Sequence, residues 1–295
     1  MKTIKVFTSK DRQLIELLKS SELYDVQELK KQSFLSKVLM QKKEYPDLYF
    51  HSGKFDEESI DMIKNAKKVI VNSFDQRYKI LAQDYTTKEN IEVVYPYVEP
   101  SEIKPKDAKT NIVEKYELNK DSAILLFVSN NFKMGGIKEF VHILNHISNK
   151  NFSAIIVGNN KDVERLQFAI NQNPLNNQIK LLNKNDIDMD EIYSASDIYI
   201  APTYMENFST NVLKAMANKT AVFVSANNAA KEIVDVFATM SEPNDPSTIF
   251  KVDALVSGHE IKKIKKENKK TAKKFTKEKK LQELNNIIDK ISTQV

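Results

Sequence analysis

Short, nearly continuous apolar runs alternate with helix-like segments along most of this 295-residue chain. The clearest of these runs are residues 123–128, 154–157, 179–182, 198–201 and 222–225. A strand that is covered by helices on both faces has such a run, because neither face meets water. Strands that alternate with helices build parallel sheets. The second half of the chain is therefore predicted to be a doubly wound α/β domain.

The chain is long enough for two domains, since single cores rarely grow to this size. Weaker strand-like runs precede the clear ones, at residues 4–7, 48–51, 69–72 and 93–95, with helix-like stretches at 12–19 and 58–65. Three prolines then fall between residues 96 and 105, and because proline ends both helices and strands, residues 97–110 are predicted to be a linker. We expect domains at residues 1–105 and 106–260. Residues 261–295 are expected to be a lysine-rich segment and an amphipathic C-terminal helix.

Composition excludes several classes of site. The chain has no cysteine, so disulfides, thiolate metal sites and cysteine nucleophiles are excluded. Its four histidines do not lie among clustered carboxylates, so neither a metal site nor a cofactor is expected. No apolar run approaches the ~20 residues of a membrane span, and the first strand is too short for a signal peptide. We therefore expect a cytoplasmic protein.

Positive charge is concentrated in one segment. The whole chain has a net charge of +5, but residues 261–280 alone hold eleven lysines and two glutamates, a local charge of +9. The rest of the chain therefore carries −4. Such a segment is predicted to attract an anionic surface; a solvated linker helix is the alternative. Nucleic-acid binding is not expected, because Phe275 is the only aromatic residue there and stacking needs several.

Residues 197–225 predict a ligand site. They form a buried strand, a loop that carries Glu206, a helix that opens on Ser209, Thr210 and Asn211, and a second strand. The unpaired N–H groups of a helix N-terminus suit phosphate, and a nearby carboxylate suits a sugar hydroxyl. A phosphorylated sugar or nucleotide is the predicted ligand, and simple helix capping beside a solvated acid is the alternative.

A second candidate loop, residues 128–136, lies between a buried strand and a helix. It contains Asn130, Asn131, Lys133 and the adjacent Gly135 and Gly136. Adjacent glycines let backbone N–H groups approach a ligand, and a lysine can add positive charge near a phosphate. An ordinary strand-to-helix turn is the alternative. The chain has only five glycines, and two of them lie here, which favours a ligand.

These segments resemble the donor-sugar motifs of the retaining family-four glycosyltransferases, over roughly residues 120–240. The resemblance implies an α/β fold of two Rossmann-like domains in the GT-B arrangement, the first abbreviated. It implies that Glu206 faces the donor sugar, and it places His51 at a strand end near that sugar; a satisfied loop histidine is the alternative. The donor-binding positions it implies are Asn130, Asn131, Lys133, Gly135, Gly136, Gly158, Asn207, Phe208, Ser209, Thr210, Asn211 and Lys214. Asp197, nearby, is expected to anchor its strand.

The chain departs from the family pattern at functional positions. Lys214 stands where the family has a second glutamate that grips the ribose, and lysine can only donate hydrogen bonds. Gly135 stands where the family has a loop lysine, and no arginine lies near Asn130. Ser209 and Lys219 replace glycines of the family.

The function implied by the resemblance is hexosyl transfer from a nucleotide-diphosphate sugar to a glycan or lipid-linked glycan acceptor, in polysaccharide or lipopolysaccharide assembly. Enzymes of this kind stabilise the leaving phosphate with protein groups, so no metal is implied. Because the acceptors are lipid-anchored, the basic segment 261–280 is expected to contact the inner face of the cell membrane. The alternative is a degenerate relative that binds a sugar, nucleotide or partner protein without turnover.

Overall fold

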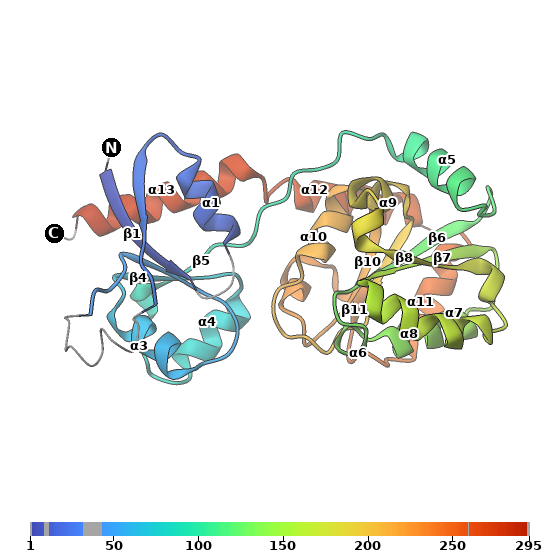
Figure 1. Cartoon of the computed structure of the whole chain (residues 1–295), viewed down its shortest axis with the longest axis horizontal. Coiled ribbons are helices and arrows are strands. Elements are labelled where there is room, and N and C mark those ends of the chain that lie inside the picture. Colours follow the sequence, from blue (N-terminus) through green and yellow to red (C-terminus); the bar gives the residue numbers. More distant parts are fainter. Residues whose placement is uncertain (1, 9–11, 32–42, 259, 294–295) are drawn as a thin grey trace. The chain divides into compact units, whose positions relative to one another are not determined.

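The computed structural model describes residues 2–8, 12–31, 43–258 and 260–293, and the chain divides into two compact units (Figure 1). Unit 1 comprises Met1–Tyr97 and Phe275–Val295, and unit 2 comprises Val98–Lys274. The lysine-rich segment and final helix, expected together after the second domain, are therefore divided between the units. Their two helices, α12 (Ile261–Ala272) and α13 (Lys277–Thr293), pack on different cores.

Unit 1 has a five-stranded parallel sheet in the order β2-β1-β3-β4-β5. Alternate side chains of its strands face opposite layers, as the period of two requires. Ile4, Val6 and Phe50 pack with α1 and α13, and Tyr49 and Val69 pack with α3 and α4. The strands are β1 (Lys2–Thr8), β2 (Tyr24–Glu28), β3 (Leu48–His51), β4 (Lys68–Val71) and β5 (Ile91–Val93), and the other helices are α1 (Gln13–Lys19), α3 (Glu57–Asn65) and α4 (Phe74–Leu81).

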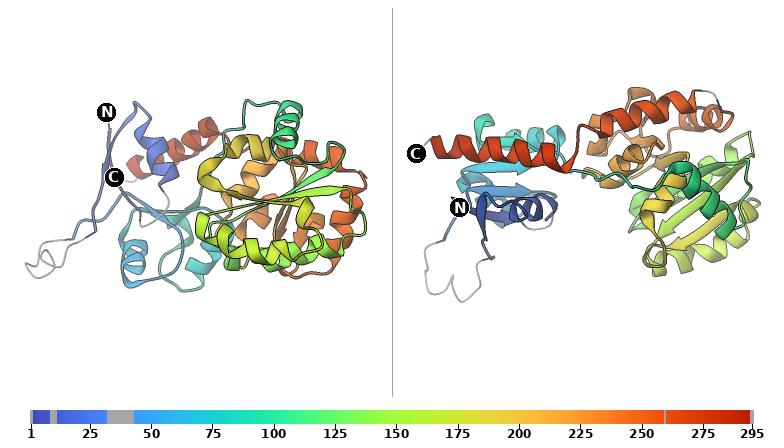
Figure 2. Two further views of the ribbon diagram at one scale, coloured as in Figure 1. Left: turned by 45° about the vertical axis from the view of Figure 1, so that its right-hand side comes forward. Right: turned by 90° about the horizontal axis from the view of Figure 1, so that it is seen from above.

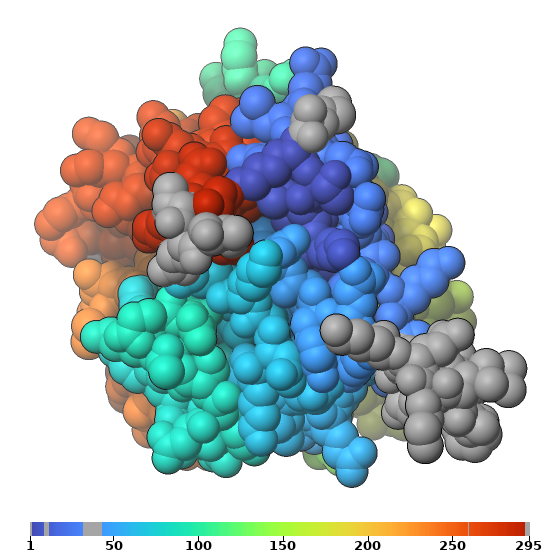
Figure 3. Space-filling model, turned by 90° about the vertical axis from the view of Figure 1, so that its left-hand side faces the viewer, coloured from blue at the N-terminus to red at the C-terminus, as the bar shows by residue number. Residues whose placement is uncertain are grey.

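Helix α13 completes unit 1 with residues from the far end of the sequence. Its apolar face, which includes Leu284 and Ile288, is buried against β1 and α1. Figure 2 shows the helix running along the unit, and Figure 3 shows it, in red, beside the N-terminal residues in dark blue. The predicted amphipathic helix is thus confirmed. None of the described helices is long and apolar enough to cross a membrane.

Unit 2 has a six-stranded parallel sheet in the order β11-β10-β9-β6-β7-β8. The strands are β6 (Ala123–Val128), β7 (Phe152–Gly158), β8 (Ile179–Asn183), β9 (Ile198–Ala201), β10 (Ala221–Ser225) and β11 (Thr239–Met240). The chain builds outward from β6 in one direction and then returns to add β9 on its other side, so the order reverses between β6 and β9. Doubly wound sheets bind ligands at the carboxyl ends of the strands at such a point.

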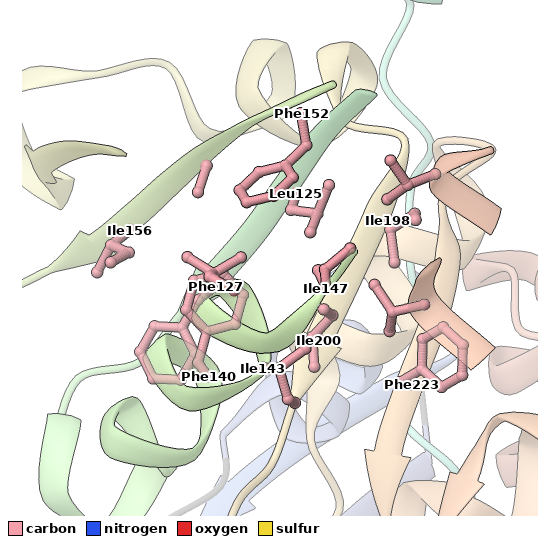
Figure 4. Close-up of a cluster of buried hydrophobic side chains, with 14 of the residues drawn as sticks. Leu125, Phe127, Phe140, Ile143, Ile147, Phe152, Ile156, Ile198, Ile200 and Phe223 are labelled. Atoms are coloured by element: carbon pink, nitrogen blue, oxygen red, sulfur yellow. The ribbon is translucent and has the colours of Figure 1, made fainter. Parts of the chain in front are cut away.

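Helices cover both faces of this sheet. The remaining helices of unit 2 are α5 (Pro105–Lys115), α6 (Phe132–Gly135), α7 (Ile137–His146), α8 (Asn160–Asn171), α9 (Met189–Ala195), α10 (Thr210–Ala217) and α11 (Ser247–Val256). Helices α7, α8 and α11 share one apolar core with the strands, in which Phe127, Phe140 and Phe152 are almost fully buried (Figure 4). Helix α10 packs against β9 and β10, and helix α12 packs against α10 and β10. The two-domain α/β prediction is confirmed.

The predicted linker is wrong in its second half. Residues 105–115, in and beyond that linker, form helix α5, because Pro105 occupies the first helical position, where proline's missing N–H costs nothing. After β10 the chain forms a short 3₁₀ turn, Ala229–Ile233, which begins where the Asn228 side chain accepts a hydrogen bond from the backbone of Ala230.

Candidate functional site: a cavity at the carboxyl edge of the unit 2 sheet

A cavity of about 160 Å³ lies at the carboxyl ends of β6 and β9, where the strand order reverses. The segments that follow these two strands, with the N-terminus of α10, form its wall. The lining residues are Phe127, Val128, Ser129, Asn130, Asn131, Gly135, Tyr199, Ala201, Thr203, Met205, Ser209 and Asn211. Both loops that the sequence singled out therefore meet at one cavity.

The loop after β6 closes on itself through Asn131. Its side chain accepts a hydrogen bond from Met134 N at 3.0 Å, and its carbonyl accepts one from Gly135 N at 2.7 Å, which together form the short helix α6. Gly136 N donates to Lys133 O at 3.4 Å. The N–H groups of Gly135 and Gly136 therefore donate to carbonyls of their own loop and are not free to approach a ligand.

The glycines of this region permit close packing. Gly136 has φ = 82°, and a Cβ there would lie 1.7 Å from the carbonyl oxygen of Pro202, on the loop that follows β9. A Cβ on Gly135 would lie 2.4 Å from Ser129 Oγ. Gly158, one of the donor-binding positions that the resemblance implies, ends strand β7 under the ring of Phe132, and a Cβ on it would lie 2.3 Å from that ring. Of these glycines, Gly136 lets the loop after β6 approach the loop after β9.

The Met134 carbonyl joins the loop after β6 to the loop after β9. It accepts hydrogen bonds from Thr203 Oγ1 at 3.1 Å and from Tyr204 N at 2.9 Å. The Tyr204 hydroxyl in turn donates to Glu139 on α7 at 2.7 Å. Three hydrogen bonds, two to the Met134 carbonyl and one to Glu139, therefore fix the start of the loop that carries Glu206.

Asn228 fixes the rest of the Glu206 loop, and the sequence analysis did not identify it. Its fully buried side chain donates to the carbonyls of Met205 at 2.8 Å and Asn207 at 2.7 Å. Its Oδ1 accepts from Ser209 N at 3.2 Å and from Ala230 N at 3.0 Å. One amide side chain therefore uses all its hydrogen-bonding groups to shape the turn from Met205 into α10.

The N-terminus of α10 borders the cavity without a side-chain cap. Ser209 occupies the N-cap position but makes no side-chain hydrogen bond to the first turn, contrary to the capping alternative. Burial raises the pKa of the Tyr199 hydroxyl, and hydrogen bonds with the Asn211 and Ser209 side chains oppose that rise. Hydrogen bonds therefore join these three side chains in the lining of the cavity. An uncapped helix N-terminus suits an anion.

Comparison with known proteins identifies the family. The model of the family described as "Glycosyl transferases group 1" matches residues 108–282, more than half of the chain. The chain belongs to this glycosyltransferase family. A comparison with curated proteins finds no match.

Solved structures confirm that this group 1 glycosyltransferase has the GT-B fold. A glycosyltransferase from Rickettsia africae is 16% identical with a TM-score of 0.78, covering 100% of this chain and 99% of that one. Anabaena Alr3699/HepE, solved with UDP, is 14% identical with a TM-score of 0.73, covering 98% and 100%. WaaG, described as involved in lipopolysaccharide biosynthesis, is 12% identical with a TM-score of 0.67, covering 92% and 95%.

The predicted donor residues of the glycosyltransferase fall into three groups. Asn130, Asn131, Gly135, Ser209 and Asn211 line the cavity. Gly136, Gly158 and Phe208 are buried in the surrounding fold. Exposed positions on the loops or helices near the cavity, outside its lining, are Lys133, Glu206, Asn207, Thr210 and Lys214.

His51 lies in unit 1, at the end of β3. The ring is 2% exposed and stacks on Phe55 with centroids 5.3 Å apart, and its Nδ1 is 3.1 Å from the Tyr49 hydroxyl. It lines a small pocket at the carboxyl edge of that sheet, with Asn72 and Ser52. Its catalytic role stays a prediction. Among the residues that the structure describes, no three histidines or carboxylates are placed to hold a metal ion.

Asp197 anchors strand β9, as expected. Its carboxylate accepts hydrogen bonds from Ile124 N at 3.0 Å, Lys109 Nζ at 2.8 Å and Lys265 Nζ at 2.7 Å. Burial alone would raise the pKa of Asp197, but the charges of Lys265 and Lys109 outweigh it and hold the pKa below 3.8. The residue lies at the amino end of β9, at the opposite edge of the sheet from the cavity.

Proposed function

We propose that this protein transfers a hexosyl group, with retention of configuration, from a nucleotide-diphosphate sugar to a glycan acceptor. The observation that carries the proposal is the cavity at the carboxyl ends of β6 and β9, where amide side chains adjoin an uncapped helix N-terminus. Such a place suits a diphosphate. Structures of the similar Alr3699/HepE contain UDP and UDP-glucose, which supports a donor of this class.

In this proposal Asn130, Asn131 and the first turn of α10 hold the diphosphate, and Glu206 orients the sugar. Glu206 lies on an exposed loop whose backbone is fixed on both sides, since its carbonyl accepts from Ala229 N at 2.9 Å next to the Asn228 bonds. A carboxylate on a fixed loop can accept hydrogen bonds from sugar hydroxyls without the entropy cost of ordering the loop.

The acceptor is proposed to be a lipid-linked glycan of polysaccharide or lipopolysaccharide assembly, which would place the protein in the cytoplasm at the inner face of the membrane. The similarity to WaaG supports this pathway. Exposed lysines of residues 261–280 would supply the attraction to anionic lipid, about 1 kcal/mol for each engaged lysine. Lys280 is not one of them, because it is 3% exposed and pairs with Glu283 at 2.7 Å.

A degenerate, non-catalytic protein is the second candidate. Gly135 favours it, since a Cβ there would overlap Ser129, so no lysine fits this loop position without rearrangement. Lys214 also favours it, because its exposed ammonium cannot accept ribose hydroxyls. Turnover of a nucleotide sugar separates the two candidates.

Replacing Glu206 with alanine tests the proposal. The transition-state stabilisation measured with the sugar donor should fall by about 1.5–3 kcal/mol, because one charged hydrogen bond is lost. Affinity for the bare nucleoside diphosphate, measured by calorimetry on the same variant, should change little. Equal losses for both ligands would show that Glu206 does not contact the sugar.

Lys133 and Lys214 are proposed to supply the positive charge that the family's loop lysine and arginine would supply. Lys133→Ala should therefore weaken nucleoside diphosphate binding several-fold, by about 0.5–1 kcal/mol, since an exposed ammonium contributes modestly. Unchanged affinity would remove Lys133 from the site. Lys214→Glu is expected to weaken diphosphate binding; tighter binding and higher activity would instead favour the degenerate protein.

A further inference from the structure

A second hollow lies at the amino edge of the unit 2 sheet. The cavity at the carboxyl ends of β6 and β9, here called the donor cavity, lies at the opposite edge. The second hollow is bounded by α12, by the turn between α10 and β10, and by Asp197 at the start of β9, with a volume of about 860 Å³. Seven lysines line it: Lys219, Lys262, Lys265, Lys266, Lys269, Lys270 and Lys273. Six of them lie along α12 and its C-cap at helical spacing, so they form a continuous basic face.

Among the described residues that line this hollow, lysines outnumber carboxylates by seven to one. The one carboxylate, Asp197, already binds Lys265 and Lys109. Partial burial and the charges of Lys219 and Lys273 lower the pKa of Lys269. Like charges held this closely repel one another, and a bound anion would relieve that repulsion.

Lys219 occupies a backbone position that suits glycine. It follows the C-cap of α10 with φ = 60°, and the Lys219 and Thr220 N–H groups donate to the carbonyls of Met216 at 3.2 Å and Ala215 at 3.0 Å, the Schellman arrangement. A side chain in this left-handed conformation is strained. In this strained conformation the Lys219 side chain lines the hollow. Strained backbone positions often mark functional sites.

We propose that this hollow binds a compact anion that carries two or more phosphate groups. Phosphate groups match the several lysine donors that converge there. A base-stacking ligand fits poorly, because Phe275 is 7% exposed and its ring packs against Tyr95 in unit 1. The hollow and the donor cavity lie at opposite edges of the unit 2 sheet, so this site does not depend on the proposed sugar transfer.

Titration with inorganic tripolyphosphate, followed by backbone amide NMR shifts, tests the site directly. Amides of α12 and residues 218–220 are expected to shift saturably, including when the donor cavity is occupied by a nucleoside diphosphate. Shifts confined to residues 129–136 and 209–211, or no shifts, would overturn the proposal.

Paired variants distinguish this site from general electrostatic attraction. Lys269→Gln with Lys273→Gln should weaken tripolyphosphate binding at least about tenfold, because two charged donors are lost. The control, Lys263→Gln with Lys274→Gln, removes the same charge from exposed positions outside the hollow and should change the affinity less than about threefold. Equal weakening in both would contradict a built site.

Lys219→Gly separates binding from stability. Glycine relieves the left-handed strain, so the melting temperature should rise by about 2–4 °C while tripolyphosphate affinity falls. Glu117→Gly, at a residue with φ = 53° outside the hollow, should raise the melting temperature similarly and leave the affinity intact. Unchanged affinity in Lys219→Gly would remove Lys219 from the site.

Two further ligands identify the source of the phosphate groups. If the Lys269/Lys273 variant alone no longer binds vesicles of anionic phospholipid, the phosphate groups are those of lipid headgroups. If both paired variants bind the vesicles equally, the ligand is a soluble anion. A single-stranded oligonucleotide that binds more tightly than tripolyphosphate would overturn the compact-anion assignment.

Discussion

Replacing Asn228 with alanine is expected to lower sugar-donor turnover by about 100-fold, because small displacements of a positioned group carry losses of that size. The buried Asn228 side chain holds the carbonyls of Met205 and Asn207 and the N–H groups of Ser209 and Ala230. The same change should lower the free energy of unfolding by about 3 kcal/mol, since several buried polar groups lose their partners. Steady-state kinetics and chemical denaturation measure the two effects.

Asn227→Ala is the matched control for this variant, because the neighbouring side chain is exposed. It should change stability by less than about 0.5 kcal/mol and leave turnover near that of the unmodified protein. Asn228→Asp keeps the acceptor but places a buried carboxylate oxygen against the carbonyl oxygens of Met205 and Asn207, so it should lower stability at least as much as Asn228→Ala. Normal turnover of the sugar donor by Asn228→Ala would show that the hydrogen bonds of Asn228 do not position Glu206 for the reaction.

Replacing Asp197 with asparagine should lower the free energy of unfolding by about 3 kcal/mol, because removing one partner of a buried ion pair leaves charge uncompensated. The carboxylate side chain is 17% exposed and lies between Lys109 at 2.8 Å and Lys265 at 2.7 Å. Because the Lys109 and Lys265 side chains are 31% and 22% exposed, the expected loss of unfolding free energy is at the lower end of the range for buried ion pairs. Asp186→Asn, at an exposed carboxylate, should change stability by less than about 0.5 kcal/mol.

Asp197 also predicts a pH dependence. Its folded pKa lies below the ordinary value of 3.8, so the unfolded chain binds the proton more tightly. The stability that it contributes is therefore fully present above pH 3.8 and is lost as the pH falls through the folded pKa. Acid unfolding of Asp197→Asn should lack this component. An identical acid dependence in both proteins would contradict the ion-pair account.

The sequence predicted the strands best where burial on both faces leaves a continuous apolar run. The runs at 123–128 and 198–201 match β6 and β9, and the two loops that follow them meet at the cavity. Strand β2 was missed because it is a polar edge strand, whose side chains alternate between burial and exposure. Helix α5 was missed because Pro105 signals a helix start as well as a helix end.

Features that depend on distant segments could not be predicted from local patterns. Nothing near Asn228 indicates that its side chain reaches residues 205–209, although an asparagine shortly after a buried strand is a weak signal for a loop at the carboxyl edge. Helix α13 was recognised as amphipathic, but its pattern does not say that it packs on β1. The lysine-rich segment showed its charge and not the hollow that it helps to line.

We propose that the cavity between the ends of β6 and β9 binds the diphosphate of a nucleotide sugar. Calorimetric titration of the protein and of Asn130→Trp with a panel of nucleotide-diphosphate sugars tests this site, because Asn130 is exposed at the cavity and an indole there would fill it. We predict saturable one-to-one binding of at least one donor, abolished by Asn130→Trp and unchanged by Asn177→Trp, an exposed position outside the cavity. Binding that Asn130→Trp leaves intact, or none with any donor, would contradict the account.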